Sequence, residues 1–183
     1  MEIKISTKSI LNFLYVLAWI IFVGICIEVC GLLFNTFFII GHNPLGPNAI
    51  WEGADLSSLY AYDMGYFLVE TLLTIIPAIL KALMFYLIVK ILHSRLDITK
   101  LFSETVRRFI VNLAYLSLGI GLFSFWGVNY TQWLVKQGVK MPDLQQLHLA
   151  GADVWLFMAV TLFVISQIFK RGIEIQDEHE LTV

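Results

Sequence analysis

The chain has 183 residues, of which 58% are hydrophobic and only 14% are charged, and its mean hydropathy is +0.79. Soluble proteins carry about 25% charged residues, so this composition excludes an ordinary soluble globular domain. The net charge of -2 excludes nothing, because the position of each charge matters more than the sum in a membrane protein. The apolar residues come in four long blocks. This pattern predicts a single all-α domain, a polytopic membrane protein built as a bundle of four transmembrane helices.

The first apolar block predicts a membrane span over residues 10–34. The apolar run continues well past the roughly 7–15 residues of a cleavable signal peptide, and we expect it to remain as the first helix. Glu28 lies in this span between Gly24 and Gly31. Small residues on either side of the acid predict a face that another helix can approach closely.

The second span is predicted over residues 66–92, after a connector rich in turn-forming residues in which Asp55 is the expected N-cap of a short helix. At about 100° per residue, its polar positions fall on one stripe of the helix. These positions are Glu70, Thr74, Pro77 and Lys81. Because a charged side chain at membrane depth faces protein or water, we expect the other helices to pack around this one.

The third and fourth spans are predicted over residues 109–133 and 150–169, with a polar, acidic cytoplasmic tail over 170–183. Ser103 is the expected N-cap of the third helix, with Glu104 in its first turn. Small residues give the third helix close contact points, and aromatic residues gather at its far end, as is typical of a membrane–water interface. The small residues are Ser117, Gly119, Gly121, Ser124 and Gly127, and the aromatic ones Trp126, Tyr130 and Trp133.

The lysines and arginines predict the orientation in the membrane. Two of them, Lys136 and Lys140, fall on one side, Lys81 lies within a span, and the rest fall on the other side. The positive-inside rule therefore places both termini in the cytoplasm. The cations on that side are Lys4, Lys8, Lys90, Arg95, Lys100, Arg107, Arg108, Lys170 and Arg171.

Three acids are predicted to lie at a similar depth, near the outer face. Glu28, Glu70 and Asp153 are each about twenty residues from a flanking lysine, or roughly 25–30 Å along a helix. Either each acid separately faces the outer headgroups or accepts a hydrogen bond, or the three form a buried polar cluster with Lys81 that could hold a cation or a proton. Lys81 itself could extend toward the inner headgroups or pair with a buried acceptor such as Asn112 or Tyr115.

No catalytic motif, phosphate-binding loop or metal-ligand spacing is present, so we expect no catalytic residues, no metal site, no cofactor and no enzyme activity. The basic surface on the cytoplasmic side could bind anionic lipid or a cytoplasmic protein, or could serve only to set the topology. Its members are Lys90, Arg95, Lys100, Arg107, Arg108, Lys170 and Arg171. The expected partners are the bilayer and a cytoplasmic or membrane protein, with no direct contact to nucleic acid. The oligomeric state is left open.

Two segments resemble a known family. The connector LFSETVRR (101–108) and the ending QIFKRGIE (167–174) with EHELTV (178–183) are similar to the bacterial membrane proteins grouped as domain-of-unknown-function family 2975. The resemblance implies four transmembrane helices in the bacterial cytoplasmic membrane and no established activity. It also implies that the gene often lies beside one for a small helix-turn-helix regulator.

Two functional hypotheses follow. The leading one is a non-enzymatic accessory protein of the bacterial inner membrane, of a stress-sensing or immunity type, linked to a small transcriptional regulator. The alternative is a small transporter or channel that uses the intramembrane residues Glu28, Glu70, Asp153 and Lys81.

Overall fold

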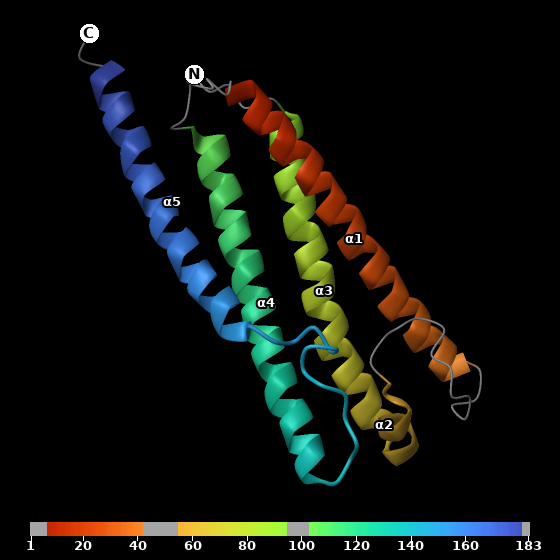
Figure 1. Ribbon diagram of the computed structural model, residues 1–183. Helices are drawn as coiled ribbons and strands as arrows, with labels where there is room; N and C mark the ends of the chain where they lie inside the picture. The colour runs from red at the N-terminus through yellow and green to blue at the C-terminus, as the bar shows by residue number, and fades with distance from the viewer. Residues whose placement is uncertain (1–6, 42–54, 95–102, 181–183) are drawn as a thin grey trace, which may run out of the picture.

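The computed structural model describes residues 7–41, 55–94 and 103–180 (Figure 1). These ranges contain five helices: α1 (Thr7–Gly41), α2 (Ser57–Tyr62), α3 (Met64–His93), α4 (Glu104–Lys136) and α5 (Ala152–Glu180). All except α2 are long and apolar enough to cross a membrane. The predicted all-helical class, with four helices long and apolar enough to span a membrane, is therefore confirmed.

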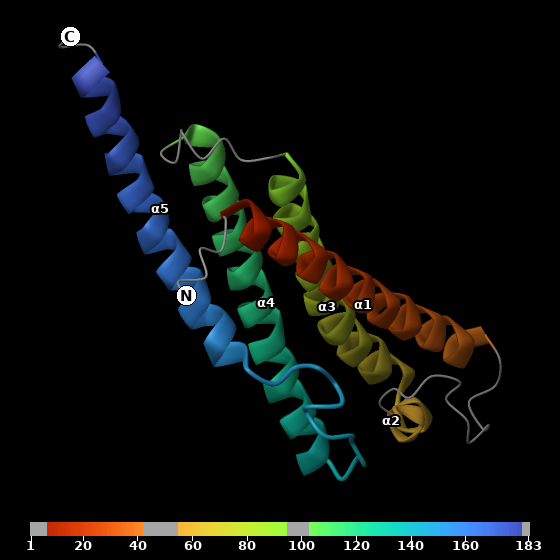
Figure 2. The ribbon, with the colours of Figure 1, turned by 45° about the horizontal axis from the view of Figure 1, so that its top comes forward.

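The long helices form an open bundle in which each packs mainly against its neighbours in the chain, α1 on α3, α3 on α4 and α4 on α5. The start of α1 and the end of α5 lie at one end of the molecule, here called the terminal end (Figure 1). The short helix α2 and the loop 137–151 lie toward the opposite end, here called the cap end (Figure 1). Helix α1 crosses α3 obliquely, and α5 projects beyond the other helices at the terminal end (Figure 2).

Side-chain caps define where the helices start. Asp63 accepts a hydrogen bond from the Tyr66 backbone N–H at 3.0 Å and caps α3. Ser103 accepts one from Val106 at 3.4 Å and caps α4, as predicted. Asp55 lies one residue before the N-cap position of α2, yet it accepts bonds from the Ser57 hydroxyl at 2.6 Å and the Ser57 N–H at 3.0 Å. These two bonds stabilise the carboxylate and lower the pKa of Asp55 below its ordinary value.

Small residues of α4 make its contacts with both neighbours close, as the sequence predicts. A Cβ atom on Gly119 would come within 3.0 Å of Leu80 on α3, and one on Gly121 within 2.7 Å of Leu156 on α5. Ser117 is fully buried, and its hydroxyl lies 3.8 Å from the sulfur of Met84. These contacts also fix which levels of α3, α4 and α5 lie side by side.

Two hydrophobic clusters fill the interior. At the cap end, Leu59 of α2, Phe67 of α3, Leu134 of α4 and Val139 of the loop form the cap core. Toward the terminal end, a second cluster of Met84, Leu113 and Ile120 is covered by residues of α5 that include Trp155 and Met158. The cap end thus has a core of its own, which α5 does not reach.

The helices are longer than the predicted spans, and α5 continues as a helix to Glu180 through most of the segment 170–183 that we expected to be a polar tail. A hydropathy pattern measures only the apolar length of a helix, and a helix can continue in polar sequence. In α5 this polar extension carries ion pairs one turn apart, from Lys170 and Arg171 to Glu174.

Candidate functional site

The loop 137–151 turns back from the cap end into the bundle (Figures 1 and 2). It begins with the Val139 N–H donating to the Leu134 carbonyl at 3.2 Å, and further on Leu149 packs where Gly127 of α4 leaves space. Helix α5 therefore starts roughly 15 Å along α4 from its cap end. Non-helical backbone at such a depth is tolerated where protein buries it. The sequence predicts a break at Met141–Pro142 but not this return into the bundle.

His148 stands out in this loop. Its φ of 53° lies in the left-handed region, which is uncommon for residues other than glycine. The residues on either side of it, Leu147 and Leu149, are 2% and 0% exposed, whereas the side chain of His148 is half exposed. Backbone hydrogen bonds within residues 143–149 hold this shape. The loop thus anchors two leucines in the bundle and presents the imidazole on its other side.

His148 joins two helices. Its Nδ1 atom lies 3.2 Å from Oε1 of Glu28 on α1, and its backbone carbonyl accepts a hydrogen bond from Lys81 Nζ of α3 at 3.1 Å. The Lys81 ammonium also lies 5.9 Å from the ring centre of Trp155 on α5, within the range of a cation–π contact. We call Glu28, Lys81 and His148 the loop latch. Its two partly buried side chains of opposite charge, Glu28 of α1 and Lys81 of α3, both contact the loop at His148.

The direction of Lys81 differs from both predicted alternatives, the inner headgroups and pairing with Asn112 or Tyr115. In a helix, long side chains lean toward the N-terminus, and the N-terminus of α3 lies at the cap end. Lys81 therefore reaches toward the loop. Asn112 and Tyr115 instead line a separate surface hollow with Leu83 and Tyr86.

Glu70 belongs to a second polar site, inside the cap end. Its side chain is 0% exposed, and its Oε1 atom lies 2.6 Å from the hydroxyl of Thr131 on α4. Its Oε2 atom is buried with no hydrogen-bond partner among the described residues, and the same holds for the hydroxyl of Ser124, further along α4. The predicted polar stripe of α3 does face inward, since Thr74 and Pro77 are buried as well.

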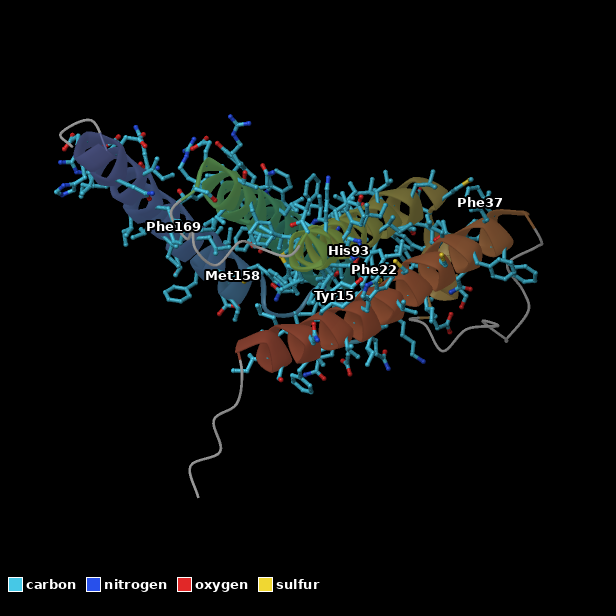
Figure 3. The ribbon with its side chains drawn as sticks, turned by 90° about the horizontal axis from the view of Figure 1, so that it is seen from above. Tyr15, Phe22, Phe37, His93, Met158 and Phe169 are labelled. Carbon is cyan, nitrogen blue, oxygen red and sulfur yellow. The ribbon has the colours of Figure 1, made fainter. Side chains whose placement is uncertain are left out.

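The structure thus divides the predicted acidic cluster. Contacts of Tyr15 with His93 and of Phe22 with Tyr86 set the register of α1 on α3. Figure 3 shows Tyr15, Phe22 and His93 where the two helices meet. When this register is extended along both helices, Glu28 of α1 lies at the level of Lys81 of α3. That level is about 15 Å along the helix from the level of Glu70.

The depth estimate was wrong because it used Lys8 and Lys90 as markers of one membrane boundary. In the structure Tyr15 is level with His93 near the end of α3, so Lys8 lies about two turns beyond that level. Asp153, the fourth predicted member of the cluster, lies exposed in the first turn of α5.

The predicted basic surface is only partly described, because Arg95 and Lys100 lie outside the described residues. Arg107 and Arg108 both pair with Glu104, and Lys170 and Arg171 both pair with Glu174. Lys90 is exposed. Much of the positive charge is therefore balanced within the chain, which weakens the attraction of this surface for anionic lipid.

A small cavity of about 30 Å³ lies among α1, α2, α3 and the loop, large enough for one or two water molecules. Apolar side chains and several hydroxyl and amide groups line it, among them Thr36, Thr71, Thr74, Asn35 and Gln146. Within residues 7–41, 55–94 and 103–180, no group of three or more His, Cys, Asp or Glu side chains is placed to hold a metal ion.

Two residues of these sites are absent from the predicted set, His148 and Thr131. The sequence places His148 on a connector, and only its position between two leucines in LHL hinted that the loop is anchored. Thr131 lies in the polar run Asn129–Gln132 after the apolar part of α4, where nothing marks it as the partner of an acid.

Comparisons with known proteins add one finding. No curated protein and no solved structure matches the chain. A family model with the description "Protein of unknown function (DUF2975)" matches residues 6–183, nearly the whole chain. The resemblance seen in the two sequence segments is thereby confirmed, and the chain belongs to this family of proteins of unknown function.

Proposed function

We propose that the protein is a non-enzymatic accessory protein of the bacterial cytoplasmic membrane that senses the state of the cell envelope. In this proposal the terminal end faces the cytoplasm, and the cap end with its latched loop faces outward. The observation that carries it is the loop latch, in which one segment between two spans is held by ionisable side chains of two other helices.

The distribution of cations supports this orientation. Lys170 on α5 and Arg107 on α4 lie at equal sequence distances from the contact of Leu156 with Gly121, so they are at the same level of the bundle. Lys90 lies near the same end of α3. Lys136 and Lys140 are at the cap end, and the larger number of cations marks the cytoplasmic side by the positive-inside rule.

We expect cysteine labelling of intact cells to follow this orientation. In a background without Cys26 and Cys30, a membrane-impermeant maleimide should modify a cysteine in place of Lys140 and should not modify one in place of Glu178. Permeabilised cells, in which both positions should react, are the control. Labelling of the Glu178 position in intact cells would contradict the orientation.

Sensing is a suitable role for a loop that is anchored but only partly buried. The loop is held at His148, through the Glu28 carboxylate on α1 and the Lys81 ammonium on α3. Lys81 also contacts Trp155 of α5, so displacement of the loop would change the contacts of three spans, α1, α3 and α5, at once. A membrane-perturbing condition that displaces the loop would therefore change how these helices pack, and this change would extend to their cytoplasmic ends.

The interior supports a transporter less well. On the terminal side of Lys81 the space between α3 and α4 is filled by Met84, Leu113 and Ile120, with Trp155 and Met158 of α5 packed against them. The polar stripe of α3, which runs from Glu70 to Lys81, therefore ends at about the middle of that helix. The described part of the interior offers no polar path from there to the terminal end.

The test of the proposal compares the transcripts of a strain that lacks the gene, complemented with the wild-type chain or with His148→Ala, before and after membrane stress. We expect the variant to change the stress-dependent expression of the neighbouring regulator gene and its targets. His179→Ala, in the polar extension of α5, is the matched control and should behave like wild type. Identical transcripts for the deletion, wild type and His148→Ala would overturn the proposal.

A further inference from the structure

Glu70 is buried in a place that offers no positive charge. No Lys, Arg or His among the described residues pairs with it, and the nearest cation on its own helix, Lys81, is about three turns away and turned toward the loop. The ionisable group that interacts with it is Tyr130 on α4, whose other ionisable neighbours are Tyr66 and Asp63, and all of these groups are acids. An ionised carboxylate would be unfavourable in such surroundings.

The hydroxyl of Thr131 gives an independent argument. It lies 2.6 Å from Oε1 of Glu70 and 2.9 Å from the backbone carbonyl oxygen of Gly127. A hydroxyl has one hydrogen, so it cannot donate to both of these oxygens. Both contacts become hydrogen bonds only when Glu70 carries a proton: the acid then donates to Thr131, and Thr131 donates to Gly127.

The other oxygen of the acid agrees with this assignment. Oε2 is fully buried and has no partner among the described residues. The free-energy cost of a buried oxygen without a hydrogen-bond partner is far smaller for the carbonyl oxygen of a neutral acid than for an oxygen of a charged carboxylate. Three separate observations, the full burial, the single hydroxyl hydrogen and the unpartnered oxygen, therefore lead to the same state of Glu70.

We infer that Glu70 is a proton-binding site, at which the packed cap end holds one proton between α3 and α4. The inference concerns the site alone and does not depend on the sensing role. Because an ordinary glutamate ionises at about pH 4.3, the unfolded chain has released this proton at neutral pH, whereas the folded cap retains it. The folded state then binds more protons, and its stability must fall as the pH rises.

Infrared spectroscopy of the full chain reconstituted in lipid tests the site directly. The difference spectrum between wild type and Glu70→Gln at pH 7 should contain the carbonyl band of one protonated carboxylic acid. Glu104→Gln is the matched control, because Glu104 is exposed and paired with Arg107 and Arg108, and its difference spectrum should contain carboxylate bands. Carboxylate bands for Glu70 as well would overturn the inference.

Stability gives a second measure. Above about pH 4.3, where the unfolded chain has lost this proton and the folded chain retains it, the folding equilibrium constant of the wild type should fall relative to that of Glu70→Gln, by up to about tenfold per pH unit, until the pH at which the folded chain releases the proton as well. The amide should fold because it can donate to Thr131 as the acid does. An equal pH dependence of the two chains would contradict a proton at Glu70.

A variant-free measurement covers the case in which Glu70→Gln does not fold. Dicyclohexylcarbodiimide adds to neutral carboxylic acids in apolar surroundings, with the acid proton passing to nitrogen and the carboxyl group becoming bonded to the reagent. Peptide mass spectra of the treated wild type should show the adduct at Glu70. An adduct on Glu28 or Asp153 with Glu70 unmodified would overturn the inference.

Discussion

Gly121→Ala should destabilise the folded chain by about 1–3 kcal/mol, although alanine is the better helix former. The added Cβ would lie 2.7 Å from two side-chain carbons of Leu156 and 3.0 Å from its backbone nitrogen. A side chain can change its rotamer, but the backbone nitrogen can move only if α5 moves away from α4. The free energy of unfolding in detergent micelles, measured by heat or denaturant, gives the size of the effect.

Gly24→Ala is the matched control for this change. Gly24 also lies in a long apolar helix, and a Cβ there would meet nothing within 4 Å. The control should leave the free energy of unfolding unchanged or raise it by up to about 1 kcal/mol. Equal stabilities of the two variants would show that α4 and α5 do not pack as closely as described here.

Lys81→Met should release the loop. The methionine fills a similar volume, but it leaves the His148 carbonyl without its donor and Glu28 without its nearby cation. Loss of one partner from a partly buried polar pair costs about 1–3 kcal/mol. We expect residues 137–151 to be cut faster in limited proteolysis and the free energy of unfolding to fall by this amount.

Lys90→Met separates the latch from a general effect of removing a charge. Lys90 lies on the same helix and is exposed. Its replacement should alter neither the rate of cleavage in the loop nor the stability by more than a few tenths of a kcal/mol. If Lys81→Met and Lys90→Met lowered the free energy of unfolding equally, the contact of Lys81 with the loop would contribute nothing to stability.

The features that could be predicted from the sequence are those that depend on local pattern. The four long apolar blocks specify the four helices, and the stripe of Glu70, Thr74 and Pro77 faces inward as the helical period requires. The small residues of α4 predict its close packing, and Ser103 predicts its start. Each of these follows from the properties of one helix alone.

The arrangement of the candidate sites could not be predicted, because it depends on the relative positions of different helices. Glu28 and Glu70 appeared to share a level only because flanking lysines were used to measure depth, and Lys8 of α1 lies about two turns beyond the level of His93 near the end of α3. The return of the loop into the bundle depends on the space at Gly127 and on the fit of Leu149 there. No periodicity in the sequence records such a fit.

The central claim, that the loop latch joins Glu28 to His148 and not to Glu70, can be tested by disulfide crosslinking in membranes. In a chain without Cys26 and Cys30, the pair Glu28→Cys and His148→Cys should form a disulfide on mild oxidation. The pair Glu28→Cys and Glu70→Cys, whose levels differ by about 15 Å, should not. A crosslink between positions 28 and 70 with none between 28 and 148 would contradict the account and restore the single acidic cluster.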